Sequence, residues 1–224
     1  MFAAARMLEP SGTGPTKSAT LTDVRFRRLL GEDQWGRLPL EVRRRFSKRL
    51  GPGDSVVYRG RVLETRLSLL GWALARLLAI AGAPLPLERS EGGEAAIVTV
   101  TEDGRSGGQV WSRSYVRNGR FPQTIHSRKS FTGPTGLQEE VGAGVGMSLV
   151  LRAADDRLEF ISERYFVTVA SRRLRLPRLL EPGRLIVTHR EVTADRFEFS
   201  LDLTHPLFGR LVHQRAEFTD PERS

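Results

Sequence analysis

Residues 197–203 alternate strictly between apolar and polar side chains and read Phe197-Glu198-Phe199-Ser200-Leu201-Asp202-Leu203. This period of two predicts a β-strand with one buried face. The strand has to end at the next segment, His205-Pro206-Leu207-Phe208-Gly209, because proline cannot continue a paired ladder. A further apolar-polar run follows at 207–218, so the two runs predict an antiparallel hairpin.

The same pattern continues towards the N-terminus as a series of short strands separated by turns. We expect strands at 55–63, 95–101, 109–116, 121–130, 145–152, 158–169, 184–192, 196–203 and 207–218. Turn-forming pairs lie between them, at Asp103-Gly104, Asn118-Gly119, Asp155-Asp156 and Ala194-Asp195. An antiparallel meander of this length has to curl to protect its edges. The expected fold is therefore α+β, mostly β, with an antiparallel sheet curled into a barrel or half-barrel.

One helix is expected inside the β region, at about 66–81. This segment is apolar almost all round, and Gly82 and Pro84 follow it in the manner of a helix end. It falls short of the ~20 residues that cross a bilayer, and it contains Arg76. We expect this helix to pack against the sheet, with contact to a membrane surface as the alternative.

Three regions are expected along the chain: a disordered tail at 1–20, a helical segment at 21–54 and the β domain at 55–220. The helical segment contains two short helices, one that ends at Gly31 and one that begins near Pro39. The second helix carries five basic residues, Arg43, Arg44, Arg45, Lys48 and Arg49. Such a face is either solvated or docks on anionic lipid or an acidic partner.

Composition narrows the classes of function. The chain has 224 residues, no cysteine and a net charge of +9, and 39% of its residues are hydrophobic. Disulfides and cysteine chemistry are excluded. Residues 1–50 carry +6 of the net charge, so the β region has no strongly basic character and nucleic acid is disfavoured as a partner. The first ten residues lack an uninterrupted apolar core. We expect a cytoplasmic protein, or one peripheral at the inner membrane.

The strand at 109–116 offers the first candidate site. It places Trp111, Arg113 and Tyr115 on one face, and that face points either into the barrel or towards solvent. If it points inward, the buried arginine needs an acidic partner or an anionic ligand. Glu139 and Glu140 are the candidate partners. The predicted ligand-binding residues are Trp111, Arg113, Glu139, Tyr165 and His205.

No metal or cofactor site is predicted, and no catalytic residue is assigned. The four histidines show no i, i+4 spacing, and no G-x-S-x-G motif occurs. The glycine-rich run at 142–146 is not a dinucleotide fingerprint, since Met147 stands where the third glycine is required.

A basic and apolar segment links two of the predicted strands. It reads Ser171-Arg172-Arg173-Leu174-Arg175-Leu176-Pro177-Arg178-Leu179-Leu180-Glu181-Pro182. One interpretation is a surface loop with its leucines tucked beneath it. The other is a lip that meets lipid headgroups.

Several short motifs, in this order, resemble a bacterial family, the domain of unknown function numbered 4166. They are Phe26-Arg27-Arg28-Leu29-Leu30-Gly31, Trp111-Ser112-Arg113, Leu137-Gln138-Glu139-Glu140-Val141-Gly142, Leu176-Pro177-Arg178-Leu179-Leu180-Glu181-Pro182 and His205-Pro206-Leu207-Phe208-Gly209. The resemblance covers about residues 24–218. Members of the family are often fused behind a saccharopine-dehydrogenase-like domain that binds NADP. The resemblance implies an architecture and carries no established activity.

Three functions are compatible with these patterns. The first is noncatalytic binding of a lipid-like, hydrophobic or anionic small molecule in the barrel. The second is an enzyme (an isomerase, a cyclase or an accessory unit to a reductase) that uses the same cavity, with Glu139 or His205 as the acid/base group. The third is an adaptor or subunit that docks on a membrane complex through the basic helix and the arginine-leucine segment.

Overall fold

The computed structural model describes residues 21–51, 54–80, 82, 85–104, 106–117, 119–142, 144–154, 156–170 and 172–221. The tail expected at 1–20 lies outside this range. Four helical elements are α1 (Arg25–Leu30), α2 (Glu32–Arg37), α3 (Leu40–Phe46) and α4 (Leu69–Ile80), and η1 (Arg178–Leu180) is a single 3₁₀ turn. The strands are β1 (Leu21–Thr22), β2 (Lys48–Arg49), β3 (Ser55–Leu67), β4 (Ala95–Asp103), β5 (Gly108–Arg117), β6 (Arg120–Ser130), β7 (Gln138–Val141), β8 (Val145–Ala154), β9 (Arg157–Val169), β10 (Arg172–Arg175), β11 (Arg184–Glu191), β12 (Arg196–His205) and β13 (Gly209–Thr219).

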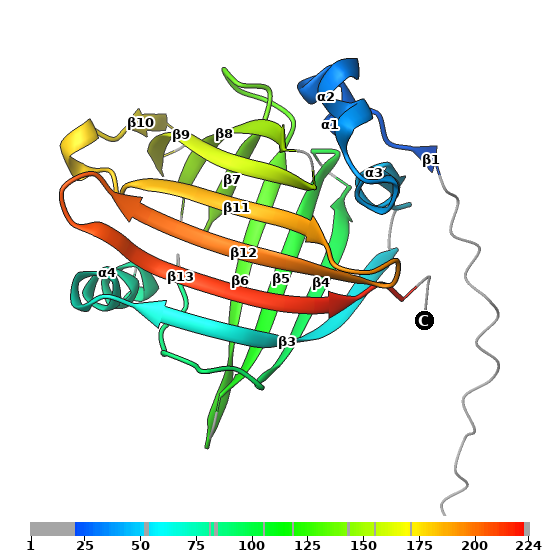
Figure 1. Cartoon of the computed structure of the whole chain (residues 1–224). Helices are drawn as coiled ribbons and strands as arrows, with labels where there is room; N and C mark the ends of the chain where they lie inside the picture. The colour runs from blue at the N-terminus through cyan, green and yellow to red at the C-terminus, as the bar shows by residue number, and fades with distance from the viewer. Residues whose placement is uncertain are drawn as a thin grey trace, which may run out of the picture.

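The large sheet is a closed antiparallel barrel. Its strands follow the order β9-β11-β12-β13-β3-β4-β5-β6-β7-β8, and β8 pairs with β9 to close the circle (Figure 1). Strand β10 adds to one edge of β9, outside the ring. Closure leaves none of the ten ring strands with an unpaired long edge, which is how a meander of this length avoids edge-to-edge association. The barrel that the alternating pattern predicted is confirmed.

The apolar residues that alternate along β12 form the face of this strand that is buried in the barrel. Phe197 and Leu203 are buried inside the barrel, and Phe197 pairs in register with Phe218 of β13. The Phe197 ring lies 5.1 Å from Tyr58 of β3 and 5.8 Å from Phe218, measured between centroids. Aromatic packing of this kind stabilises a core beyond simple burial of area. Strands β3, β12 and β13 are thereby held together at one end of the barrel.

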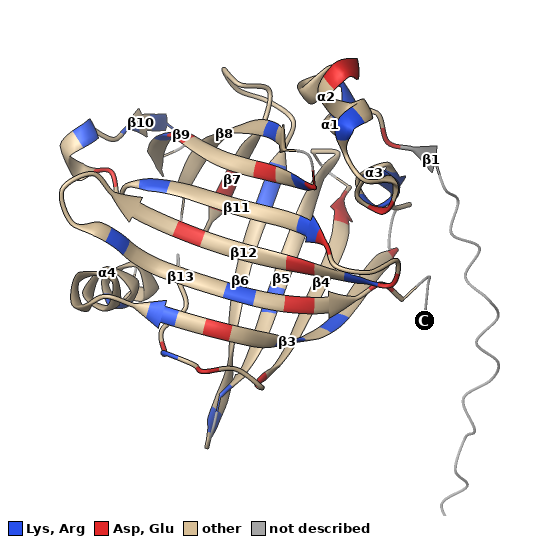
Figure 2. Ribbon diagram, viewed as in Figure 1, with Lys and Arg blue, Asp and Glu red and all other residues tan. Residues whose placement is uncertain are grey.

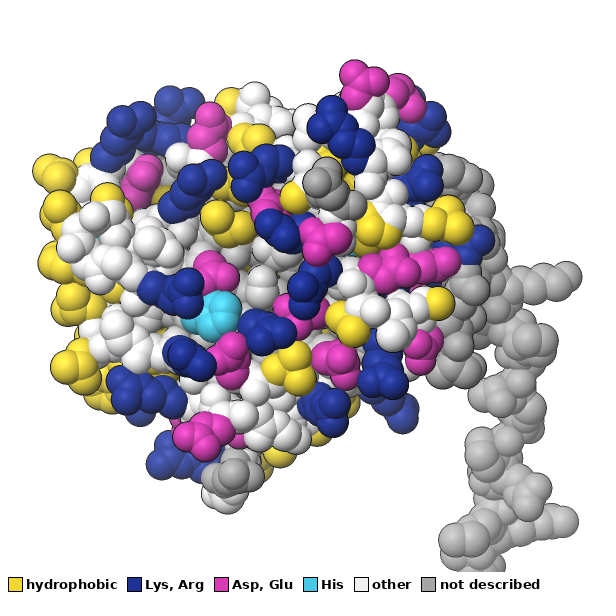
Figure 3. Space-filling view, in the orientation of Figure 1, with side chains coloured by type: hydrophobic (Ala, Val, Ile, Leu, Met, Phe, Trp, Pro, Cys, Tyr) yellow, Lys and Arg dark blue, Asp and Glu magenta, His cyan; other side chains and the backbone are white. Residues whose placement is uncertain are grey.

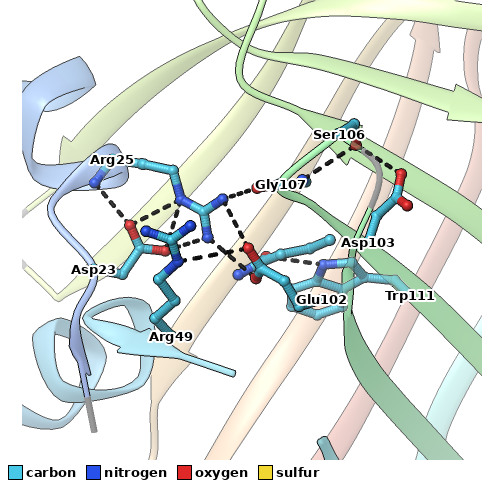
Figure 4. Close-up of polar contacts among 10 residues, drawn as sticks. Asp23, Arg25, Arg49, Glu102, Asp103, Ser106, Gly107 and Trp111 are labelled. Atoms are coloured by element: carbon cyan, nitrogen blue, oxygen red, sulfur yellow. Dashed lines mark hydrogen bonds and ion pairs between the residues drawn. The ribbon is translucent and has the colours of Figure 1, made fainter. Parts of the chain in front are cut away.

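The N-terminal helices close that end of the barrel. Their apolar side chains lie in the main hydrophobic core with residues of β8 and β9: Phe26, Leu30, Trp35, Leu38, Val42 and Phe46. Polar contacts add to this packing (Figure 4): Arg25 pairs with Asp23 at 2.6 Å, reaches Glu102 of β4 at 3.3 Å and donates to the backbone oxygen of Gly107. The helices are therefore an integral part of the core.

Arg44 and Arg49 of the predicted basic face are exposed, as a solvated face requires, but Arg45 is not. Arg45 of α3 is buried, pairs with Asp220 at 2.9 Å and donates to Nε2 of His189 at 2.9 Å. Its guanidinium also lies 4.4 Å from the centroid of the Phe197 ring. Arg45 thus fastens α3 to the barrel wall.

Helix α4 lies across the opposite end of the barrel from α3 (Figure 1). Gly71 makes this contact possible, because a Cβ at this position would lie 1.9 Å from the backbone oxygen of Leu211 in β13. Only Gly71 and Ala75 of the helix are fully buried. None of the described helices combines the length and the apolar character that crossing a bilayer requires.

Candidate functional site

The barrel encloses a cavity of about 350 Å³. Its lining is mostly apolar and comes from the strands around the ring, from α4 and from the segment that contains η1. Among its apolar lining residues are Leu74, Leu77, Leu78, Ile125, Met147, Phe160, Val167, Leu176, Leu185, Phe199, Leu203 and Phe218. The volume falls within the range of about 300–1,000 Å³ that small-molecule pockets occupy.

The aromatic face of β5 points into this cavity. Trp111, Arg113 and Tyr115 all line it, which decides between the two orientations that the sequence left open. Strand pairing explains the placement, since Trp111 lies opposite Ser127 of β6 and both side chains face the interior. Burial raises the pKa of the Tyr115 hydroxyl, against the opposing effect of the nearby Arg113 charge.

Three charged side chains meet on the wall formed by β5, β6 and β7. Lys129 of β6 and Glu139 of β7 lie opposite each other in the sheet, and Lys129 Nζ is 2.8 Å from Glu139 Oε1. Arg113 of β5 lies 3.5 Å from the same carboxylate and donates to the Ser127 hydroxyl at 2.9 Å. Lys129 and Glu139 are only 4% and 5% exposed. We call Arg113, Lys129 and Glu139 the charged triad.

Within the triad, the pKa values of Lys129 and Glu139 are both lower than usual. Burial lowers the pKa of Lys129 to about 8, and the positive charge of Arg113 adds to this effect, while Glu139 opposes it. Burial alone would raise the pKa of Glu139, but Lys129 and Arg113 outweigh it and lower that pKa to about 2. At neutral pH all three groups are therefore charged, and the triad carries a net charge of +1.

Aromatic rings surround the ammonium group of Lys129. Its Nζ lies 5.0 Å from the centroid of a Trp111 ring and 5.5 Å from that of Phe160. Cation-π contacts of this length stabilise a cation that has left water. They do not neutralise its charge, so one positive charge of the triad has no counter-charge within it.

Four of the five residues predicted to bind ligand lie in the cavity wall: Trp111, Arg113, Glu139 and Tyr165. The Tyr165 hydroxyl donates to Ser162 at 3.2 Å, and burial raises its pKa to about 12. Their role in binding stays a prediction. His205 does not line the cavity: it stacks on Phe208 in the β12–β13 turn, with 4.7 Å between ring centroids. Of the two acids proposed as partners of Arg113, Glu139 takes this position, whereas Glu140 pairs with Arg173 at 2.7 Å.

Lys129 was not predicted, although a signal for it exists. Ile125, Ser127 and Lys129 follow one another at a spacing of two along β6, and all three are buried. Extending the inward face from Ile125 would have placed the lysine inside the barrel.

The other histidines occupy separate places. His126 bonds to Ser112 at 2.7 Å, His213 lies 2.8 Å from Asp202, and His189 is buried next to Arg45. Within the described residues, no group of three or more His, Asp or Glu side chains is arranged to hold a metal ion.

Comparison with known proteins gives a family but no characterised relative. No curated protein and no solved structure matches the chain. Residues 38–218 match the family model described as "Domain of unknown function (DUF4166)". This range contains the whole β-barrel except the last residue of β13, together with α3 and the charged triad. The chain therefore belongs to this family of domains of unknown function.

Proposed function

We propose that this protein binds a hydrophobic small molecule that carries an acidic group, without transforming it. One observation carries the proposal: the mostly apolar cavity is lined by two cations, the buried Lys129 and the half-buried Arg113, and by only one carboxylate, Glu139. An uncompensated buried charge is costly. A carboxylate or phosphate on the ligand would supply the missing negative charge, and the apolar wall would take up the rest of the ligand.

The position of the charges supports a ligand with its acidic group at one end. Arg113 presents a planar guanidinium, which suits a carboxylate or phosphate in bidentate geometry. The leucines of α4 and of the η1 segment also line the cavity, and two of them, Leu77 and Leu180, are largely exposed, so the cavity opens beside them. A molecule with its acidic end at the triad would place its apolar body against these side chains.

The same geometry gives less support to acid/base catalysis by Glu139. With its pKa lowered to about 2, this carboxylate stays ionised at neutral pH and is a poor proton donor or acceptor there. Its two cationic neighbours make it a structural counter-ion. Binding is therefore the function that the site favours.

The proposal is tested by competition with a fluorescent fatty acid, cis-parinaric acid. Hexadecanoic acid should displace the probe at a concentration at least about tenfold lower than hexadecan-1-ol, since one charge-assisted contact contributes about 1.5–3 kcal/mol. Arg113→Ala should remove most of this difference. Arg152→Ala is the matched control, because Arg152 pairs with Glu159 and lines no part of the cavity. Equal displacement by the acid and the alcohol would contradict the proposal, and so would an unchanged preference in Arg113→Ala.

A further inference from the structure

The end of the barrel at α4 exposes a group of large apolar side chains. They come from three segments that are distant in sequence: α4, the β10–η1 segment and the β12–β13 turn. Leu69, Ile80, Leu179 and Leu207 are 80–92% exposed. Figure 3 shows hydrophobic side chains gathered along this edge of the molecule. We call the set the apolar rim, and its members are Leu69, Leu70, Trp72, Leu77, Ile80, Leu174, Leu179, Leu180, Leu207 and Phe208.

The apolar rim leaves many large apolar side chains in contact with water, because most of α4 is not covered by the barrel. Helix α4 is apolar almost all round, yet it buries only Gly71 and Ala75 fully against the barrel. A helix of this composition is stable when its remaining faces also meet an apolar phase. Contiguous exposed apolar patches mark interaction sites on soluble proteins. Three leucines of the arginine-leucine segment, Leu174, Leu179 and Leu180, are exposed as well, whereas Leu176 packs inward against the core.

Arginines surround the rim without enough acids to balance them. Residues 172–184, from the start of β10 to the first residue of β11, contain five arginines, and Glu181 is the one acid among them. Arg173 pairs with Glu140 at 2.7 Å. In the described part of the chain, four arginines of this segment form no ion pair, and all of them are exposed: Arg172, Arg175, Arg178 and Arg184. Figure 2 shows basic residues on β10 and η1, next to the rim.

The rim is continuous with the wall of the cavity. Leu77 of α4 and Leu180 of η1 belong to both, since each lines the cavity and is more than 60% exposed. Leu74, Leu78, Leu176 and Pro182 extend the apolar path inward. A hydrophobic molecule on this path would meet apolar side chains from the outside of the protein to the charged triad.

We propose that the apolar rim docks on an anionic phospholipid bilayer, and that the ligand passes between the bilayer and the cavity there. Leucine and tryptophan side chains would enter the boundary between headgroups and acyl chains, and the unpaired guanidinium groups would meet lipid phosphates. The excess of unpaired arginines favours this occupant, because a bilayer surface offers many negative charges that need no fixed arrangement. The passage of ligand rests on the proposed function, whereas the docking does not.

Sedimentation of the full chain with vesicles tests the docking. Vesicles that mix phosphatidylglycerol with phosphatidylcholine should bind the protein, and pure phosphatidylcholine should bind it at least about tenfold more weakly. Added salt should weaken the binding. Equal binding to both kinds of vesicle, or to neither, would overturn the proposal.

Matched variants locate the docking surface. Leu69 and Leu40 are the first residues of α4 and α3, where an aspartate favours the helix. The double variant Leu69→Asp/Leu179→Asp should lower the partition coefficient at least about tenfold, as burial of two leucines would require. Leu40→Asp should change it less than twofold. An equal loss from Leu40→Asp would place the contact at the other end of the barrel and overturn the proposal.

A second pair of variants separates local charge from net charge. Arg178→Gln/Arg184→Gln and Arg28→Gln/Arg59→Gln each remove two exposed arginines that form no ion pair within the described residues. The first pair lies beside the rim, and the second lies on α1 and on β3. The first should weaken binding to anionic vesicles about tenfold or more, and the second should do so less than threefold. Equal effects would show that only the net charge matters and would overturn the proposal.

Transfer of cis-parinaric acid from loaded vesicles tests the passage of ligand. The rate should rise with vesicle concentration and fall in Leu69→Asp/Leu179→Asp. A rate independent of vesicle concentration would show release through water and overturn direct passage. Docking without any uptake of the fatty acid would count against the proposed function alone, and uptake in solution without docking would count against the rim alone.

Discussion

Lys129 Nζ lies 2.8 Å from Oε1 of Glu139 within a mostly apolar cavity, and Arg113 approaches the same carboxylate to 3.5 Å. The two partners of this pair have opposite effects on stability. The low pKa of Glu139 means that its charged form is favoured in the folded state, whereas the low pKa of Lys129 means that its charged form is disfavoured there. These contributions largely cancel at neutral pH, as is common for buried ion pairs. Stability therefore does not explain why the chain places a lysine here, whereas the proposed binding of an acidic ligand would.

Removal of the two charges should have unequal effects on stability. Glu139→Gln leaves Lys129 and Arg113 without a counter-charge, so we expect a loss of about 3 kcal/mol or more. Lys129→Met leaves Glu139 paired with Arg113, and we expect a change within about 1 kcal/mol, since the lysine is unfavourable in its charged form. Urea unfolding at pH 7 measures both. Equal losses, or a larger loss from Lys129→Met, would contradict the arrangement of the triad.

Binding of an anionic ligand should weaken in alkaline solution. Lys129 is charged below pH 8 in the empty protein and loses its proton as the pH rises through about 8. A carboxylate ligand favours the protonated amine, so its affinity is full below pH 8 and falls above it. We expect hexadecanoic acid to bind about tenfold more weakly at pH 9.5 than at pH 7. Competition with cis-parinaric acid at both pH values measures this, with Lys129→Met as the control that should show almost no pH dependence. If the wild-type protein binds hexadecanoic acid equally well at both pH values, Lys129 does not contribute to binding of the carboxylate.

Two glycines in helices should respond to alanine with opposite signs. Gly71→Ala places a Cβ 1.9 Å from the Leu211 backbone oxygen, which forces α4 away from β13. A destabilisation of about 1–3 kcal/mol is expected. Gly36→Ala in α2 meets no atom within 4 Å, so it should stabilise by up to about 1 kcal/mol through helix propensity. Thermal unfolding compares the two. Stabilisation by Gly71→Ala would show that α4 does not pack this closely.

Acid should destabilise the protein through His189. Burial, together with the charge of Arg45, holds the pKa of this imidazole well below its usual value of about 6.5. As the pH falls below 6.5, the unfolded chain takes up a proton that the folded protein refuses, so the free energy of unfolding decreases. We expect a loss of about 1–2 kcal/mol from this residue between pH 7.5 and 5.

His189→Gln isolates this effect, because glutamine offers an oxygen to Arg45 but does not titrate. Urea unfolding of both proteins from pH 7.5 to 5 should show a shallower pH dependence in the variant. Parallel pH dependences would mean that His189 is accessible to protons in the folded state.

The barrel was predictable from sequence because most of its strands alternate clearly. The expected strand at 196–203 became β12, and the expected range 158–169 became β9 with one added residue. Strand β7 was missed, since Gln138-Glu139-Glu140-Val141 has three polar residues and no alternation. Its position depends on pairing with β6 and β8, and pairing partners cannot be read from four residues. The strand that carries the acid of the triad was thus not predicted.

The site was predictable only in part, for two physical reasons. The face of β5 with Trp111 and Arg113 has a polar and an aromatic residue, so composition did not decide its direction. Helix α4 has a composition that suits either a buried helix or one at a membrane surface, and only the packed structure shows that Leu69 and Ile80 remain exposed. One of the three arginines in α3 gave the opposite difficulty: Arg45 was expected to be solvated like its basic neighbours but is buried against Asp220.

The most direct test is to purify the protein without detergent, extract it with organic solvent and identify the released compounds by mass spectrometry. We expect about one equivalent of a lipophilic acid, held in the cavity by its apolar wall and by Arg113 and Lys129. If folded, monodisperse protein releases no such compound and the extracted protein shows no saturable uptake of hexadecanoic acid, the cavity is not a binding site for such ligands.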